Sequence, residues 1–150
     1  MKLRLNWAVI FALFVIFSPA VSKASDYDDL MQAVRDDDVM AVYSLIEGGA
    51  DVNECDSEGW TPFQEAMNKD RVDIIELMIE NGADVNTEDF GGNTALTWAA
   101  SYGSAKIAQM LIEKGADINA RTSEGYTALS IAEMEGNFDV ADVLRSAGAR

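Results

Sequence analysis

The side chains best able to do chemistry in this chain are carboxylates that stand close together in the sequence. They form the pairs Glu54 with Asp56, Glu88 with Asp89, and Glu133 with Glu135. General acid–base catalysis needs two carboxyl groups with separated pKa values in a cleft that is poor in water. The surrounding pattern places these acids on loop tips or exposed helix faces, which is typical of solvated surface acids. The sequence has no histidine, no Gly-x-Ser-x-Gly and no glycine-rich phosphate loop, so we expect no catalytic residues.

Metal and thiol chemistry have equally few candidates. The run Asp36-Asp37-Asp38 could attract Ca²⁺, but its spacing matches no calcium loop, and we interpret it as a turn that caps the next helix. The single cysteine, Cys55, excludes an internal disulfide and, without histidine, the usual zinc sites. We expect no metal and no cofactor. Cys55 could link two exported copies, but we favour an incidental thiol and a monomer.

Charge limits the kinds of partner. The 150 residues include 26 Asp and Glu against 11 Lys and Arg, a net charge of −15. Nucleic acid and anionic membrane surfaces both need a basic face, so neither is an expected partner. A basic protein is the partner that electrostatic steering favours, while the alternative is that acidity simply keeps the protein soluble. The length suits one domain with a substantial core.

The N-terminus has the order of an export signal. Lys2 and Arg4 precede an apolar run of 11 residues, Trp7 to Phe17, and small residues follow. At 1.5 Å per residue this run is too short to span about 30 Å of hydrocarbon as a helix. We predict a signal peptide over residues 1–24, cleaved after Ala24, with Ala20 as the alternative site and an uncleaved anchor less favoured. The mature protein is then expected in the periplasm or outside the cell.

Most of the remaining chain repeats one phrase. Gly82-Ala83-Asp84-Val85-Asn86, followed by Gly92-Asn93-Thr94-Ala95-Leu96, has near copies on both sides. Glycines recur every 33 residues at Gly49, Gly82, Gly115 and Gly148. Several independent positions share this period, which indicates stacked structural repeats.

The phrase resembles the ankyrin repeat, over residues from about 30 to 150. The resemblance implies an all-α solenoid of four helix-turn-helix units joined by β-hairpin-like loops. We expect a capping repeat at 25–50, repeats at 51–83 and 84–116, and a C-terminal capping repeat at 117–150. The histidine of the family pattern is replaced by Gln64, Thr97 and Ser130. Apolar positions predict the core, and in the last repeat these are Leu129, Ile131, Ala132, Phe138, Val140, Ala141, Val143 and Leu144.

Ankyrin stacks usually bind proteins along the loop tips and the exposed, concave side of the first helices. Carried over by position, the tip candidates are Ser57, Glu58, Trp60, Phe90, Asn93, Ser123, Glu124 and Tyr126. The first-helix candidates are Asn68, Lys69, Ser101, Tyr102, Met134 and Glu135. For Trp60 and Tyr126, contact with a partner and packing on the next loop are both open; Phe90 and Tyr102 are expected to contact a partner, and Trp98 to pack.

These observations favour a small, exported ankyrin-repeat protein of the bacterial periplasmic type that binds another protein through its concave face. An alternative role is an inhibitor or self-protection factor for an exported enzyme or toxin, or a stabiliser of such an enzyme. An enzyme is the least favoured reading, because the fold family is a binding scaffold and the residues for ordinary catalysis are missing.

Overall fold

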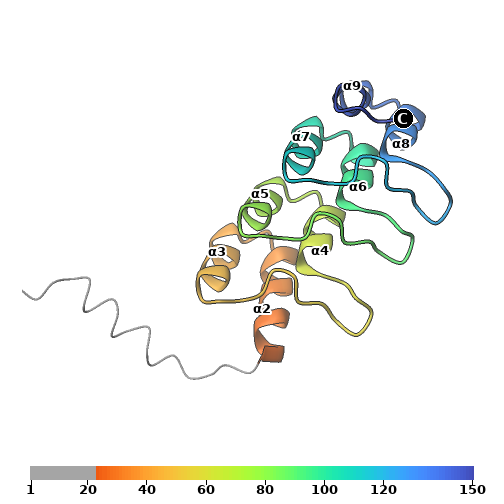
Figure 1. Ribbon diagram of the computed structural model, residues 1–150. Helices are drawn as coiled ribbons and strands as arrows, with labels where there is room; N and C mark the ends of the chain where they lie inside the picture. The colour runs from red at the N-terminus through yellow and green to blue at the C-terminus, as the bar shows by residue number, and fades with distance from the viewer. Residues whose placement is uncertain (1–22) are drawn as a thin grey trace, which may run out of the picture.

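Helices packed in pairs make up the protein. The computed structural model describes residues 23–150, and the predicted signal peptide lies outside them except for Lys23 and Ala24. The described helices are α2 (Lys23–Arg35), α3 (Val39–Glu47), α4 (Pro62–Asn68), α5 (Val72–Glu80), α6 (Ala95–Tyr102), α7 (Ala105–Glu113), α8 (Ala128–Glu135) and α9 (Phe138–Ser146). Figure 1 shows the pairs stacked in chain order, with the first helices between the second helices and a row of projecting loops. This is the all-α solenoid that the repeats predict. The predicted cleavage site after Ala24 lies in the first turn of α2.

A threonine begins the first helix of each complete repeat. The hydroxyls of Thr61, Thr94 and Thr127 accept a hydrogen bond from the backbone N–H of the residue three positions on, and that residue's side chain caps the threonine N–H in return. Such a capping box satisfies two N–H groups that the helix cannot pair internally. Pro62 follows at the first helical position, where no N–H is needed.

The turn after each first helix needs a left-handed backbone. Residues 33 apart provide it, namely Asp37 (φ 58°), Asp70 (φ 52°), Gly103 (φ 76°) and Gly136 (φ 75°). Only glycine adopts this conformation without steric cost, and aspartate is among the more tolerant alternatives. The chain therefore reverses direction in the same way four times, which keeps successive helix pairs in register.

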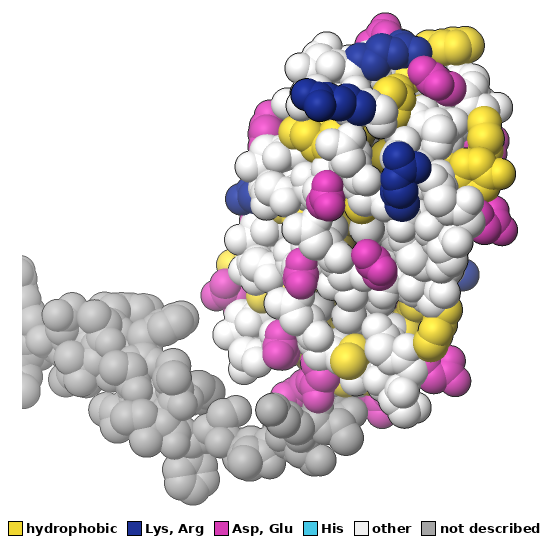
Figure 2. Space-filling model, turned by 45° about the vertical axis from the view of Figure 1, so that its right-hand side comes forward, with side chains coloured by type: hydrophobic (Ala, Val, Ile, Leu, Met, Phe, Trp, Pro, Cys, Tyr) yellow, Lys and Arg dark blue, Asp and Glu magenta, His cyan; other side chains and the backbone are white. Residues whose placement is uncertain are grey.

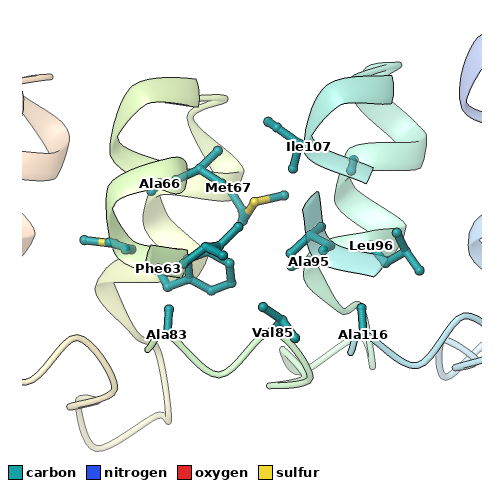
Figure 3. Packing of buried hydrophobic residues seen from close by; sticks show 14 of the residues in the cluster. Phe63, Ala66, Met67, Ala83, Val85, Ala95, Leu96, Ile107 and Ala116 are labelled. Carbon is teal, nitrogen blue, oxygen red and sulfur yellow. The ribbon is translucent and has the colours of Figure 1, made fainter. Parts of the chain in front are cut away.

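The core runs continuously between neighbouring pairs. Figure 3 shows Phe63 and Met67 of α4 directed toward Ala95 and Ile107 of the next repeat, with loop residue Val85 below them. All five side chains are buried. In the last repeat, the predicted core positions Ala132, Val140, Ala141 and Leu144 are fully buried as well.

Phe138 is the exception, since its predicted place in the core is wrong. The side chain is 66% exposed at the start of α9. The matching Val39, Val72 and Ala105 are half-buried against the core. No further helix pair packs on α8 and α9 in the described chain, so the large ring protrudes.

Asparagines join consecutive repeats. The Asn53 Nδ2 donates to the Gly82 carbonyl (3.0 Å), and its Oδ1 accepts from the Asp84 N–H (2.8 Å). Asn86 forms the same pair of bonds with Gly115 and Asp117, at 3.2 and 2.7 Å. Each bridge satisfies backbone groups at the base of a loop, so it fixes the spacing between adjacent tips.

Candidate protein-binding surface

The loop tips are held in shape by their own side chains. Asp56 Oδ1 accepts from the N–H groups of Glu58 and Trp60, both at 2.9 Å. Asp89 Oδ1 does the same for Gly91 and Asn93, at 2.8 and 2.9 Å. These local bonds replace strand pairing, since extended pairing in residues 23–150 is limited to one antiparallel bridge between Arg121 and Thr127. These two aspartates therefore act as hydrogen-bond acceptors that hold the loops in shape.

The second and third tips touch one another. The Ser123 N–H donates to the Gly91 carbonyl at 2.8 Å. A Cβ on Gly92 would lie 2.9 Å from the Ser123 backbone nitrogen, and the Gly92 φ of 68° is left-handed. Glycine is therefore required here for both close approach and backbone conformation. The contact aligns the two tips into one wall.

A groove of about 370 Å³ lies between this wall and α8, and we call it the tip groove. It is lined by Gly91, Asn93, Thr122, Ser123, Glu124, Tyr126, Ile131, Met134 and Glu135. Within it, Met134 is 62% and Tyr126 is 40% exposed. The structure thus brings together Asn93, Ser123, Glu124, Tyr126, Met134 and Glu135 of the predicted set. Two carboxylates and no cation line the groove among the described residues, so its field is negative.

Trp60 is mainly a packing residue. Its ring is half-buried, and the indole N–H donates to Glu65 Oε2 at 3.0 Å. The other oxygen of Glu65 accepts from Arg35 Nε at 3.2 Å, and the Tyr27 hydroxyl donates to the Trp60 carbonyl at 3.0 Å. Glu65, which sequence reasoning missed, is the buried centre of this network. These bonds hold Trp60 against Glu65 and α2, and its contact with a partner stays a prediction.

Tyr102 combines packing with exposure. Its ring stacks on Trp98 with centroids 5.8 Å apart, and its hydroxyl donates to the Asn68 carbonyl at 3.0 Å. Burial, with the nearby Asp70 carboxylate, raises the pKa of Tyr102 above 10.0. The ring is still 42% exposed, so one face remains open to a partner.

The remaining candidates lie around these two features. Phe90 projects from its tip with 74% of its surface exposed. Ser57, Glu58, Asn68 and Lys69 are exposed nearer the N-terminal end, and Ser101 is half-buried. Ile131, which we predicted as core, is half-buried: it packs against the core and also lines the tip groove. Ile131 lies 33 residues after Trp98 and 66 after Glu65. This period is the signal that could have predicted its place beside the tip groove.

Charge is distributed unevenly over the molecule. In Figure 2 the Lys and Arg side chains gather mainly toward the upper, C-terminal part, while Asp and Glu reach the lower end. Hydrophobic side chains break the surface along the right-hand edge of that view. Residues 23–150 contain no cluster of His, Cys, Asp and Glu suited to a metal ion. In the same part of the chain, no helix combines the length and apolarity that crossing a membrane requires.

Comparison with known proteins identifies the family. A family model for ankyrin repeats in three copies matches residues 30–122. No curated protein matches the chain.

Proposed function

Because the chain belongs to the ankyrin-repeat family, whose repeats are protein–protein interaction modules, we propose that it binds another protein through the tip groove and the adjoining tips. One observation supports this choice of surface. The groove collects exposed apolar side chains, Met134 and Tyr126, beside two carboxylates that form no ion pair within residues 23–150. Exposed apolar groups inside a polar rim are typical of interface anchors.

The groove residues suggest the chemistry of the partner. Met134 adapts its shape readily, and Tyr126 offers a ring with a polar end, so together they suit an apolar or cationic side chain. Glu124 and Glu135 favour Lys or Arg beside it. The partner segment is therefore basic and partly apolar. The protein acts by binding and not by catalysis.

The place of action is proposed from the N-terminal pattern. Residues 1–24 supply the export signal, so the partner belongs to the cell envelope or the exterior. Strong acidity also suits the narrower role of an inhibitor or stabiliser of a basic exported enzyme or toxin, because opposite charges steer association. Assaying that target's activity with and without the protein distinguishes an inhibitor from a simple scaffold.

Affinity capture from cell-envelope extract tests the surface. The variant Tyr126→Ala with Met134→Ala removes both anchors and leaves the buried core unchanged. Recovery of the partner should fall at least about tenfold, since truncating two anchors costs more than about 1.4 kcal/mol. Gln109→Ala on the exposed outer side of α7 is the matched control and should recover the partner fully. Equal recovery by the double variant would remove the tip groove from consideration.

Phe90→Ala extends the test to the neighbouring tip. Its side chain is exposed, so the truncation should leave the unfolding midpoint unchanged. Tyr102→Ala is less informative alone, because it also deletes the stacking on Trp98 and the bond to Asn68. Tyr102→Phe keeps the stacking and isolates the hydroxyl.

A further inference from the structure

The outer side of α3 differs from that of the other second helices. Met40 is 70% exposed and Tyr43 is 46% exposed. At the two corresponding positions the other repeats have only charged or amide residues, which are Asp73 and Glu76, Lys106 and Gln109, and Asp139 and Asp142. Three helices thus keep this side polar, and α3 makes it apolar. Solubility favours the polar choice, so the exchange needs another reason.

A hollow of about 420 Å³ is present beside α3. It lies between α2 and α3 and is lined by Asp29, Gln32, Ala33, Asp36, Asp38, Ala41, Ser44 and Leu45. Ser44 is four residues after Met40 and Tyr43 is three after it, so Met40 lies next to both on the helix surface and links the hollow to the apolar pair. Ala33, Ala41 and Leu45 give the hollow an apolar floor. We call the hollow together with Met40 and Tyr43 the N-terminal surface.

Acidic side chains line the hollow of the N-terminal surface, namely Asp29, Asp36 and Asp38. The one basic residue within α2 and α3 whose side chain is described, Arg35, has its guanidinium engaged by Glu65. Arg71 from the next repeat pairs with Asp37 at 3.1 Å. Asp36, Asp38 and Glu47 form no ion pair among the described residues. The surface is apolar at its centre and strongly negative at its edge.

We propose that the N-terminal surface docks a basic amphipathic helix of a partner protein. The apolar side of such a helix would cover Met40, Tyr43 and the floor of the hollow, and its Lys or Arg residues would meet the acidic edge. A capping role accounts for polar residues such as Asp29 and Ser44, but not for exposed Met40 and Tyr43. A second copy of the chain would oppose two acidic surfaces at short range, which like charge disfavours. This surface is at the opposite end of the stack from α8, so it is separate from the tip groove (Figure 1).

Methionine methyl NMR offers a direct test, because Met40 and Met134 are both exposed and report on the two surfaces in one spectrum. The probe is a peptide of about 15 residues with Leu and Lys at helical spacing. It should shift the Met40 methyl signal and weaken with added salt. The same peptide with Glu in place of every Lys should leave Met40 unmoved. No shift of Met40, or an equal shift of Met40 with the Glu peptide, would overturn the proposal.

Two variants separate apolar contact from charge. Met40→Asp with Tyr43→Glu copies the residues of α5 and makes the surface more negative, yet its affinity for the Lys peptide should fall at least tenfold. Asp36→Asn with Glu47→Gln keeps the apolar pair, and it should weaken binding and reduce the dependence on salt. Unchanged affinity in the first variant would show that charge alone attracts the peptide, and would refute the docking surface. Sedimentation must show a monomer; a dimer that Met40→Asp dissociates would assign the surface to self-association and refute the proposal.

Discussion

Substituting Gly103 tests how the repeats are joined, because Gly136 provides a matched control. The two residues are 33 apart and share a left-handed backbone, with φ of 76° and 75°. A Cβ on Gly136 meets nothing within 4 Å. A Cβ on Gly103 would lie 2.8 Å from the Asn137 Oδ1. The same change to alanine thus causes backbone strain at both sites and a collision at only one.

The magnitudes follow from these contacts. Left-handed alanine costs about 1–2 kcal/mol, and the reduced entropy of the unfolded chain returns about 0.5–1 kcal/mol. Gly136→Ala should therefore destabilise by about 0.5–1 kcal/mol. At Gly103 the Asn137 side chain must move, and it donates to the Ala100 and Ser101 carbonyls at 2.8 and 3.0 Å. Losing two hydrogen bonds costs about 1–3 kcal/mol more.

Urea unfolding followed by circular dichroism measures both costs. Gly103→Ala should lower the free energy of unfolding by about 1–3 kcal/mol more than Gly136→Ala, with unchanged m-values. In an Asn137→Ala background the collision is gone, so the extra cost should disappear. Equal costs for the two glycines would refute the role of Asn137 as a bridge between repeats.

Three further predictions concern titration, the thiol and export. Burial raises the pKa of Tyr27 and Tyr102 above 10.0. Their contribution to the stability of the folded protein is therefore complete below pH 10.0 and is lost as the pH rises through the raised values. Unfolding midpoints that stay constant in that range would contradict the shifts. Cys55→Ser should change neither the unfolding midpoint nor the monomeric state of the protein. A disulfide-linked dimer on non-reducing gels that this substitution removes would contradict the prediction. The intact mass of protein isolated from the cell envelope should be that of a chain starting at Ser25. A mass that includes Met1 would exclude cleavage.

The repeated features of the fold were predictable because each position does the same physical work in every repeat. Thr61, Thr94 and Thr127 cap a helix, and Gly82 and Gly115 take a left-handed backbone (φ 86° and 88°) after the second helix. A local requirement that recurs every 33 residues is visible without knowledge of distant contacts. The tip candidates followed from the same period.

Features that depend on one particular neighbour were not predictable. Trp60 is fixed by Glu65, which in turn is held by Arg35, 30 residues away. Phe138 occupies a position that is half-buried in the other repeats, and it is exposed in the last described helix pair, on which no further pair packs within residues 23–150. The contact of Ser123 with Gly91, which closes the tip groove, depends on how two loops meet in space. Sequence spacing predicts the features that recur in every repeat, but it does not predict contacts with one particular neighbour.

Rigidity connects the architecture to the proposed binding. The Asn86 bridge ties the loop bases at 3.2 and 2.7 Å, and the bond from Ser123 to Gly91 ties the tips at 2.8 Å. The two tips that form one wall of the tip groove are thus fixed before a partner arrives, so binding loses little conformational entropy. Asn86→Ala should consequently weaken partner binding, although Asn86 does not line the groove. Tyr126 and Met134 should stay exposed, and the loss of affinity should appear as slower association or faster dissociation. An affinity equal to that of the parent protein would mean that the groove forms only on contact with its partner.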